Sequence, residues 1–191
     1  MKTILLCGKA GSGKSYLLDK IFDTYYGKNE LNYLRLCTTR PPRDDETDGI
    51  DYDFCNEKEF SEKIFLWKDG FSVGEGLNWH YWKYGLELSR VDQTKTNIGI
   101  LPPRGIKEYL NWFPMTTKVF YISASPRTRL IRQMDRELNP DYSEICRRFL
   151  SDEKDFLKLR EFSFTKIRND NFPKDQGLDL IFEAIDNWRI G

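Results

Sequence analysis

The stretch Gly8-Lys9-Ala10-Gly11-Ser12-Gly13-Lys14-Ser15 decides how the rest of the chain is interpreted. It matches the pattern G-x-x-x-x-G-K-[ST], in which glycines allow positive φ angles so that several backbone N–H groups point at a phosphate. The apolar run Ile4–Cys7 before it predicts a buried strand, and the apolar spacing after it predicts a helix. Because a phosphate-binding loop sits between a strand and a helix, we favour it over a glycine-rich turn without a ligand.

The residue types in this loop also predict its ligands. Lys14 is expected against the β- and γ-phosphates of ATP, and the Ser15 hydroxyl is expected to bind Mg²⁺. The following helix adds the positive end of its dipole. The predicted ATP-binding residues of the loop are Gly8, Ala10, Gly11, Ser12, Gly13, Lys14, Ser15 and Tyr16.

Short apolar runs alternate with amphipathic stretches along the chain, which is typical of a parallel α/β sheet flanked by helices. Predicted strands are Thr3–Cys7, Leu34–Thr38, Asn97–Leu101, Val119–Ile122 and Phe164–Arg168. Predicted helices are Lys14–Tyr25, Glu57–Trp67, one from Ser125-Pro126 to Leu138, one from Ser143 to Leu159, and Leu178–Trp188. The aromatic and glycine-rich stretch Phe71–Leu86 has β character and predicts an inserted subdomain.

Composition narrows the possible partners. The 191 residues carry 30 basic and 30 acidic side chains, a balance that predicts neither a nucleic-acid partner nor a membrane surface. The four cysteines form no C-x-x-C pair and there is one histidine, so a structural zinc site is not expected. Scattered cysteines, and an N-terminal apolar run too short for a signal peptide, predict a cytoplasmic protein with reduced thiols.

Two further segments resemble a known family. The first segment is Cys37-Thr38-Thr39-Arg40-Pro41-Pro42-Arg43, and the second is Asp48-Gly49-Ile50-Asp51-Tyr52-Asp53-Phe54. Together they resemble the signature of the guanylate kinases, which have Ser-Thr-Thr-Arg-x-Pro-Arg and Gly-x-Asp-Tyr-x-Phe at this spacing. Weaker similarity continues through Tyr84-Gly85, Arg129-Leu130, Arg147-Arg148 and Asn169-Asp170. The resemblance implies one P-loop NTPase-like domain, with its core at 1–38, 87–132 and 144–191, a nucleoside-monophosphate-binding insertion at about 39–86 and a helical lid at about 133–143.

The resemblance also implies roles for residues outside the loop. An acceptor phosphate would be held by Arg40, Arg43, Tyr52 and Tyr84, since guanidinium forks and phenol hydroxyls suit a dianionic phosphate. Arg136 and Arg148 are the predicted catalytic residues beside Lys14, and at least two of the five arginines of the lid region are expected on a solvated helix face. These five are Arg129, Arg132, Arg136, Arg147 and Arg148. Asn169 is expected near the donor adenine.

Glu75 either reads the acceptor base or lies in an exposed turn between glycines. The aromatic residues Trp79, Tyr81, Trp82 and Tyr84 fit the core of a small sheet better than a base-stacking surface. The acidic stretch Asp44–Glu46 is expected to be solvated.

Three positions depart from the family pattern. Leu36 and Leu86 replace serine or threonine residues that meet guanine, and Ile98–Pro103 contains none of the acidic residues that follow this strand in the family. A polar base edge that faces leucine loses its hydrogen-bond partners, so the acceptor is GMP or dGMP by resemblance, or a pyrimidine nucleotide such as dTMP by these substitutions.

The sequence therefore predicts a nucleoside monophosphate kinase that uses ATP and Mg²⁺, as a monomer or homodimer. The alternative is a weakly active or inactive guanylate-kinase-like protein-interaction module. The intact Lys14 and Ser15 argue against that alternative.

Overall fold

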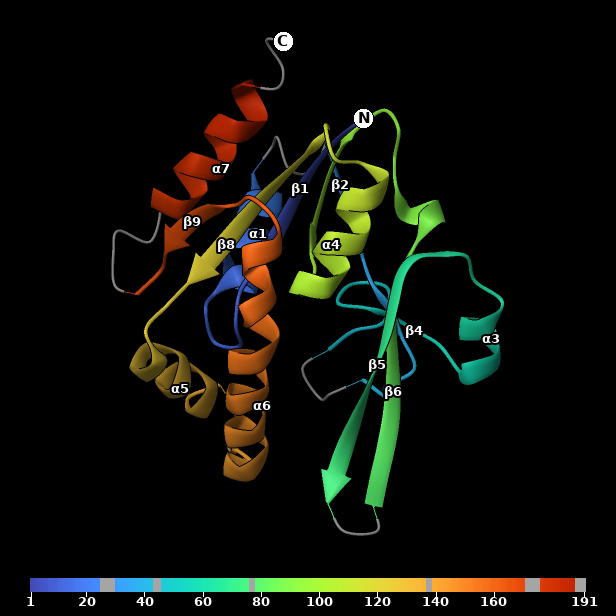
Figure 1. Ribbon diagram of the computed structural model, residues 1–191, viewed down its shortest axis with the longest axis vertical. Coiled ribbons are helices and arrows are strands. Elements are labelled where there is room, and N and C mark those ends of the chain that lie inside the picture. The colour runs from blue at the N-terminus through green and yellow to red at the C-terminus, as the bar shows by residue number, and fades with distance from the viewer. Residues whose placement is uncertain (25–29, 43–45, 76–77, 137–138, 171–175, 188–191) are drawn as a thin grey trace.

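The protein is an α/β structure from which a long hairpin extends (Figure 1). The computed structural model describes residues 1–24, 30–42, 46–75, 78–136, 139–170 and 176–187, with the backbone alone for 73–75, 78–79 and 176–177. No helix within these ranges is long and apolar enough to cross a membrane.

Five parallel strands form the central sheet in the order β2-β7-β1-β8-β9. The middle strand β1 (Lys2–Cys7) pairs with β7 (Thr96–Ile100) on one side and with β8 (Thr117–Ser123) on the other. The outer strands are β2 (Leu31–Tyr33) and β9 (Thr165–Arg168). The predicted parallel α/β core is therefore confirmed.

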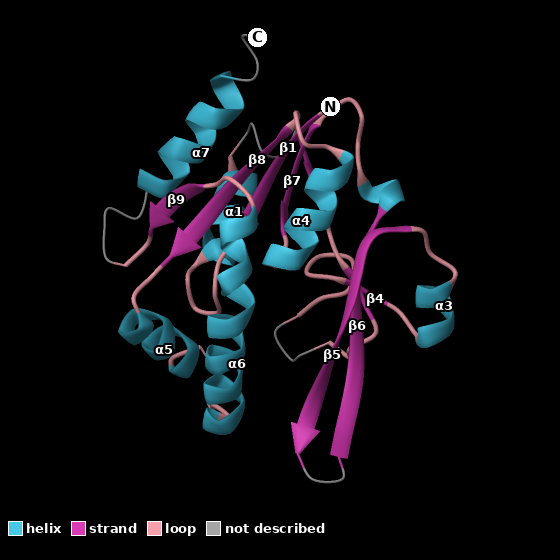
Figure 2. Cartoon of the chain, in the orientation of Figure 1, coloured by secondary structure: helices cyan, strands magenta, loops and turns pink. Residues whose placement is uncertain are grey.

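Helices cover both faces of this sheet (Figure 2). The helices are α1 (Lys14–Asp23), α3 (Glu57–Ser61), α4 (Pro103–Trp112), α5 (Pro126–Met134), α6 (Tyr142–Asp155) and α7 (Gln176–Asn187), with 3-10 turns η1 (Leu88–Arg90) and η2 (Phe156–Glu161). Side chains alternate along β1, so Ile4 and Leu6 pack with α1 and α7, whereas Leu5 and Cys7 pack with α4 and η2. Burial on both faces explains why β1 is an unbroken apolar run.

A second, mixed sheet forms the insertion, in the order β4-β3-β6-β5. Its long hairpin consists of β5 (Phe65–Glu75) and β6 (Asn78–Glu87), which are the two magenta arrows that extend from the body in Figure 2. The short strand β3 (Cys37–Thr38) runs antiparallel to β6 and parallel to β4 (Asp53–Phe54). The β character predicted for Phe71–Leu86 is therefore confirmed.

Two predicted elements are wrong in extent. The expected strand Leu34–Thr38 is divided: the Leu34 amide still donates to Ile98 O in the central sheet, but Cys37–Thr38 pairs in the second sheet. The expected helix Glu57–Trp67 ends at Ser61. The next residues form the start of β5, since pairing with β6 buries Leu66 and Trp67 against the core.

The helices of the C-terminal half correct the prediction further. α4 was not expected, although Pro103 at its first position and the buried Ile106 and Tyr109 are helix signals. Ser125 caps α5 as predicted, because its side chain accepts a hydrogen bond from the Thr128 amide. The next cap is Asp141 rather than the expected Ser143. The described part of the last helix ends at Asn187.

Candidate nucleotide-binding site

The predicted phosphate loop joins the end of β1 to the start of α1. Gly11 and Gly13 have φ angles of 75° and 90°, and Gly13 is the N-cap of α1. A Cβ atom on Gly13 would lie 2.2 Å from Asn169 Nδ2, and one on Gly11 would lie 2.4 Å from the Arg129 carbonyl oxygen. Both the backbone conformation and the close neighbours therefore require glycine at these positions.

Lys14 and Ser15 open α1 beside this loop. Lys14 is half-buried, and loss of solvent around its ammonium lowers its pKa, against the opposing effect of Asp152. Arg136 lowers the pKa of Lys14 further, so the charge of this predicted lid arginine reaches the loop. Ser15 is exposed, so its hydroxyl is free to meet a ligand at the helix N-terminus.

A carboxylate from α6 reaches the phosphate loop, which the sequence did not predict. The Ala10 amide donates a hydrogen bond to Asp152 Oδ2 over 2.6 Å. Burial raises the pKa of Asp152, whereas the Ala10 amide, Lys14 and Arg129 lower it, with burial the stronger influence. The Ala10 amide, which suits a phosphate oxygen, therefore binds a carboxylate oxygen in this structure, and the same carboxylate acts on the charge of Lys14.

Neighbouring charges hold α6 against the loop. Glu153 pairs with Lys9 Nζ at 2.5 Å and with Arg129 Nη2 at 2.8 Å. Arg129 is 2% exposed, and its guanidinium lies 4.4 Å from the ring centroid of Phe149. Arg129 is thus a buried structural cation that joins α5 to α6, rather than a residue that is open to a ligand.

Arg132 and Asn169 stabilise the loop through hydrogen bonds to its backbone carbonyl oxygens. Asn169 Nδ2 donates to the Ser12 carbonyl oxygen at 2.8 Å, and Arg132 Nη2 donates to the Asn169 carbonyl oxygen at 2.9 Å. Arg132 Nη1 also approaches the carbonyl oxygens of Gly11 and Ser12, each at 3.4 Å. The side-chain amide of Asn169, expected near the donor adenine, therefore contacts the loop backbone directly.

The residues predicted to bind an acceptor phosphate form a second cluster in the insertion. Arg40 Nε donates to the Tyr84 hydroxyl at 3.1 Å, and its guanidinium lies 5.4 Å from the Tyr52 ring centroid. The Tyr52 and Tyr84 rings meet edge to face at 6.1 Å. The structure thus brings together three residues that the resemblance assigned to an acceptor phosphate. Arg43 and the side chain of Glu75 lie outside the described part of the chain.

Glu46 neutralises Arg40, contrary to the prediction that its acidic stretch is solvated. Arg40 Nη1 lies 2.8 Å from Glu46 Oε2, and the two side chains are 11% and 7% exposed. Burial lowers the pKa of Arg40, but Glu46 and the Tyr84 hydroxyl outweigh it, so this pKa is raised. Like the phosphate loop, the acceptor cluster therefore holds a carboxylate.

The other lid arginines lie on α6. Arg148 Nε donates to Glu144 Oε1 at 2.6 Å, and Arg147 makes two bonds to the same carboxylate. Glu144 raises the pKa of Arg147, and Tyr84 adds to that shift, so the charge of Arg147 reaches the acceptor cluster. α6 thus contacts the loop through Asp152, and its Arg147 interacts electrostatically with Tyr84.

The two leucines at guanine-reading positions pack in the core. Leu86 is fully buried in the cluster that covers one face of the central sheet, and Leu36 packs against that cluster. In this conformation Leu86 presents no surface to a base. Any effect of Leu86 on base recognition therefore acts through its neighbours in β6.

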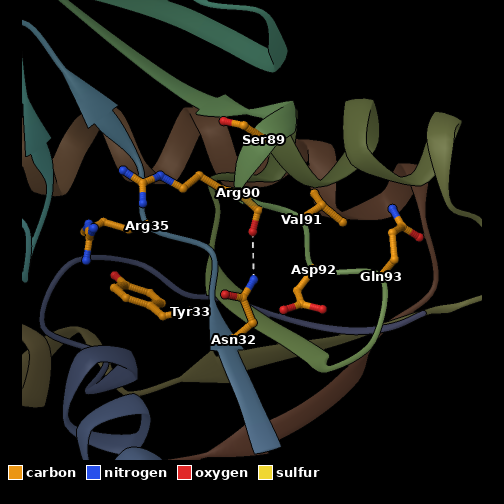
Figure 3. Close-up of a pocket in the computed structure, with 8 residues that line it drawn as sticks. All are labelled: Asn32, Tyr33, Arg35, Ser89, Arg90, Val91, Asp92 and Gln93. Carbon is orange, nitrogen blue, oxygen red and sulfur yellow. Dashed lines mark hydrogen bonds between the residues drawn. The ribbon is translucent and has the colours of Figure 1, made fainter.

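A pocket of about 520 Å³ lies where the chain crosses between the two sheets (Figure 3). Its lining comes from β2 and from the segment between β6 and β7, and Asn32 Nδ2 donates to the Arg90 carbonyl oxygen at 2.7 Å. Arg35 Nε binds Asp53 Oδ1 at 2.6 Å, and Arg90 binds the other carboxylate oxygen. Asp53 therefore links Arg35, which follows β2, to Arg90, which lies between β6 and β7. The residues that line this pocket are not those of the two phosphate-type clusters.

The fold and this site define a P-loop nucleotide-binding protein. A family model described as guanylate kinase matches residues 1–68. Over 183 residues, the chain is 29% identical to guanylate kinase from Bdellovibrio bacteriovorus, covering 93% of this chain and 94% of that protein. It is 26% identical to guanylate kinase from Mycoplasma genitalium over 177 residues, covering 91% of this chain and 71% of that protein.

The fold comparison agrees with the sequence comparisons. The crystal structure of guanylate kinase from Anaplasma phagocytophilum superposes with a TM-score of 0.63 at 15% identity, covering 100% of this chain and 87% of that one. The resemblance predicted from the sequence motifs is confirmed: the chain is similar to guanylate kinases in sequence and in fold.

Proposed function

We propose that this protein is a nucleoside monophosphate kinase that transfers the γ-phosphoryl group of ATP to a (deoxy)nucleoside monophosphate. The observation that supports this most strongly is the presence of two separate clusters that suit a phosphate group. One is the phosphate loop with Lys14, and the other is Arg40 with the Tyr52 and Tyr84 rings. Two such clusters suit a reaction in which one phosphoryl group passes between two nucleotides.

The residues act mainly by position and charge, because phosphoryl transfer needs little covalent chemistry from the protein. Lys14 and the loop amides would bind the donor phosphates, while Arg40 and Tyr84 would orient the acceptor phosphate. Arg136, whose charge already reaches Lys14, would stabilise the negative charge of the transferring group. We assign no general base.

The residues also suit Mg²⁺, which supplies charge neutralisation between the phosphates. Ser15 offers an exposed hydroxyl beside Lys14 at the start of α1. Within the described ranges, no group of three or more acidic, histidine or cysteine side chains could hold a metal ion. Mg²⁺ usually keeps several waters, so one hydroxyl together with nucleotide phosphates suffices.

For the acceptor base, the family favours GMP or dGMP, whereas Leu36 and Leu86 favour a less polar edge such as that of dTMP. Leu36 packs at the margin of the core and Leu86 lies within it, so neither position provides the hydroxyl that guanine would use. We therefore propose that this protein discriminates less in favour of guanine than its family does. A clear preference for GMP in a panel would refute that part of the proposal.

The test is a coupled assay with ATP and Mg²⁺ against a panel of ribo- and deoxynucleoside monophosphates. Lys14→Ala is the test variant, and Lys20→Ala, an exposed lysine later in the same helix, is the matched control. We expect turnover to fall at least about a hundredfold in Lys14→Ala and to remain in Lys20→Ala. Equal turnover in both variants would rule out the assigned role of Lys14.

A protein-interaction module is the second candidate function. The Asp152 carboxylate at the Ala10 amide and the lack of acidic residues in Ile98–Pro103 favour it, because both weaken a metal–triphosphate site. Absence of turnover with every acceptor, in a protein that is folded by circular dichroism, would favour this module over the kinase.

A further inference from the structure

Two cysteine sulfurs lie in contact at the edge of the insertion. Cys37 Sγ and Cys55 Sγ are 2.8 Å apart, although the residues are 18 positions apart in the sequence. Cys37 is in β3, and Cys55 follows β4, where its amide donates to the Thr38 carbonyl oxygen at 3.0 Å. Cys37 faces Asp53 in the parallel register, so Cys55, two residues later, projects from the same face.

The geometry favours a covalent bond between these sulfurs. A disulfide has an S–S length of about 2.0 Å, so the two atoms need to approach by only about 0.8 Å. The backbone pairing of β3 with β4 already holds both residues in place, so closure orders little additional chain.

The two thiols differ in access. Cys37 is fully buried, whereas Cys55 is half-buried. Burial raises the pKa of both thiols, but the hydrogen bond between them raises the pKa of Cys37 and lowers that of Cys55, and Lys63 also lowers the pKa of Cys55. Because Cys55 is the more accessible of the two, it is the thiol that a reagent reaches first, and Cys37 is placed to attack it in a second step.

We propose that Cys37 and Cys55 form a modification site at which low-molecular-weight disulfides oxidise the pair to an intramolecular disulfide. The Cys55 thiolate attacks one sulfur of the reagent and releases one thiolate, which leaves a mixed disulfide on Cys55. The Cys37 thiol then attacks the Cys55 sulfur and expels the second reagent thiolate, which takes up the Cys37 proton. Two protein thiols are oxidised by two electrons, and the reagent disulfide is reduced to two thiols.

This bond would join the two ends of the segment that carries much of the acceptor cluster. Arg40 follows Cys37 by three residues, and Tyr52 precedes Cys55 by three. Oxidation would fix the separation of these ends while leaving the phosphate loop, on β1 and α1, outside the closed ring. The inference stands without the proposed kinase activity, because it concerns the thiols themselves.

The test uses the full chain with Cys146→Ser, which removes an exposed thiol on α6 that would otherwise react separately. The protein is incubated with oxidised glutathione at mildly alkaline pH, quenched with acid and measured by intact mass and peptide mapping. We expect loss of two hydrogen atoms, no bound glutathione, and a peptide that links Cys37 to Cys55. Thermal unfolding should shift upward by roughly 6–12 °C and return after reduction.

Single variants separate the two chemical steps. Cys37→Ala should accumulate one glutathione on Cys55, because the second thiol is absent, and Cys55→Ser should stay unmodified because Cys37 is buried. A lasting mixed disulfide on Cys55 in the protein that retains both thiols, or no reaction at Cys55 at all, would overturn the proposal. These readouts need no nucleotide, so they are independent of any failure of the kinase assay.

Discussion

Asp152 makes a quantitative prediction about triphosphate binding. A triphosphate that uses the Ala10 amide must displace the carboxylate oxygen that lies 2.6 Å from that nitrogen. A hydrogen bond to a charged group contributes about 1.5–3 kcal/mol and one between neutral groups about 0.5–1.5 kcal/mol. Asp152→Asn keeps the shape and lowers the displacement cost by about 1–2 kcal/mol, so we expect triphosphate affinity to rise about 5- to 30-fold.

The same substitution should leave the empty protein folded. Burial raises the pKa of Asp152, which means that the fold already disfavours the charged carboxylate relative to solvent. A neutral amide removes that cost and can still accept a hydrogen bond from the Ala10 amide. Lys14 loses a nearby negative charge, so its pKa should fall further.

Titration calorimetry with ATP and with inorganic tripolyphosphate, at fixed Mg²⁺ and without acceptor, measures the effect directly. Asp155→Asn is the matched control, because Asp155 is exposed and lies on the same helix. We expect both ligands to bind Asp152→Asn more tightly, with Asp155→Asn close to the unmodified protein. Unchanged or weaker binding by Asp152→Asn would refute the displacement and indicate that Asp152 supports the bound state.

Three further predictions follow from the contacts of the site. Arg40→Lys should raise the acceptor KM about tenfold or more while donor affinity stays constant, because lysine cannot form the guanidinium fork; a matching fall in donor affinity would contradict this role. Asp53→Asn should reduce the free energy of unfolding in urea by about 1–3 kcal/mol, since Asp53 pairs with two arginines, and an unchanged midpoint would contradict it. Because the pKa of Asp152 is raised in the folded state, this group stabilises the fold fully at pH values below its unfolded pKa, and the contribution is lost as pH rises through its folded pKa. The difference in free energy of unfolding between Asp152→Asn and the unmodified protein should therefore shrink on acidification. Chemical denaturation at several pH values measures this difference.

Local patterns predicted the strand, loop and helix that carry the expected donor residues. The phosphate loop is continuous in sequence, and its glycines, Lys14 and Ser15 are recognisable because strand, loop and helix follow one another directly. Arg40, Tyr52 and Tyr84 were grouped through family resemblance, and the structure brings them together. In both cases, spacing along the chain carries the information.

Long-range contacts were not predictable in this way. Asp152 is 142 positions from Ala10, and no periodicity along α6 distinguishes it from the neighbouring solvated acids. Division of the apolar stretch Leu34–Thr38 was missed because a buried strand has the same pattern in either sheet. The helix predicted for Glu57–Trp67 was too long for a similar reason. Phe65–Trp67 belongs to β5, whose partners in β6 are about 20 positions away in the sequence.

Two carboxylates, Asp152 and Glu46, lie against the positively charged groups of the two clusters. Arg129 and Arg136 both lower the pKa of Lys14, so cations at the phosphate loop already repel one another. Burying such charges without an anion is costly. Asp152 offsets part of the repulsion because it raises the pKa of Lys14, although its own charge is disfavoured by burial, and Glu46 pairs with Arg40. Nucleotide phosphates would then exchange for carboxylates rather than enter an uncompensated cationic cavity. Because Asp152 lies on α6 and Glu46 on the acceptor segment, each exchange would break a contact that holds that element in place.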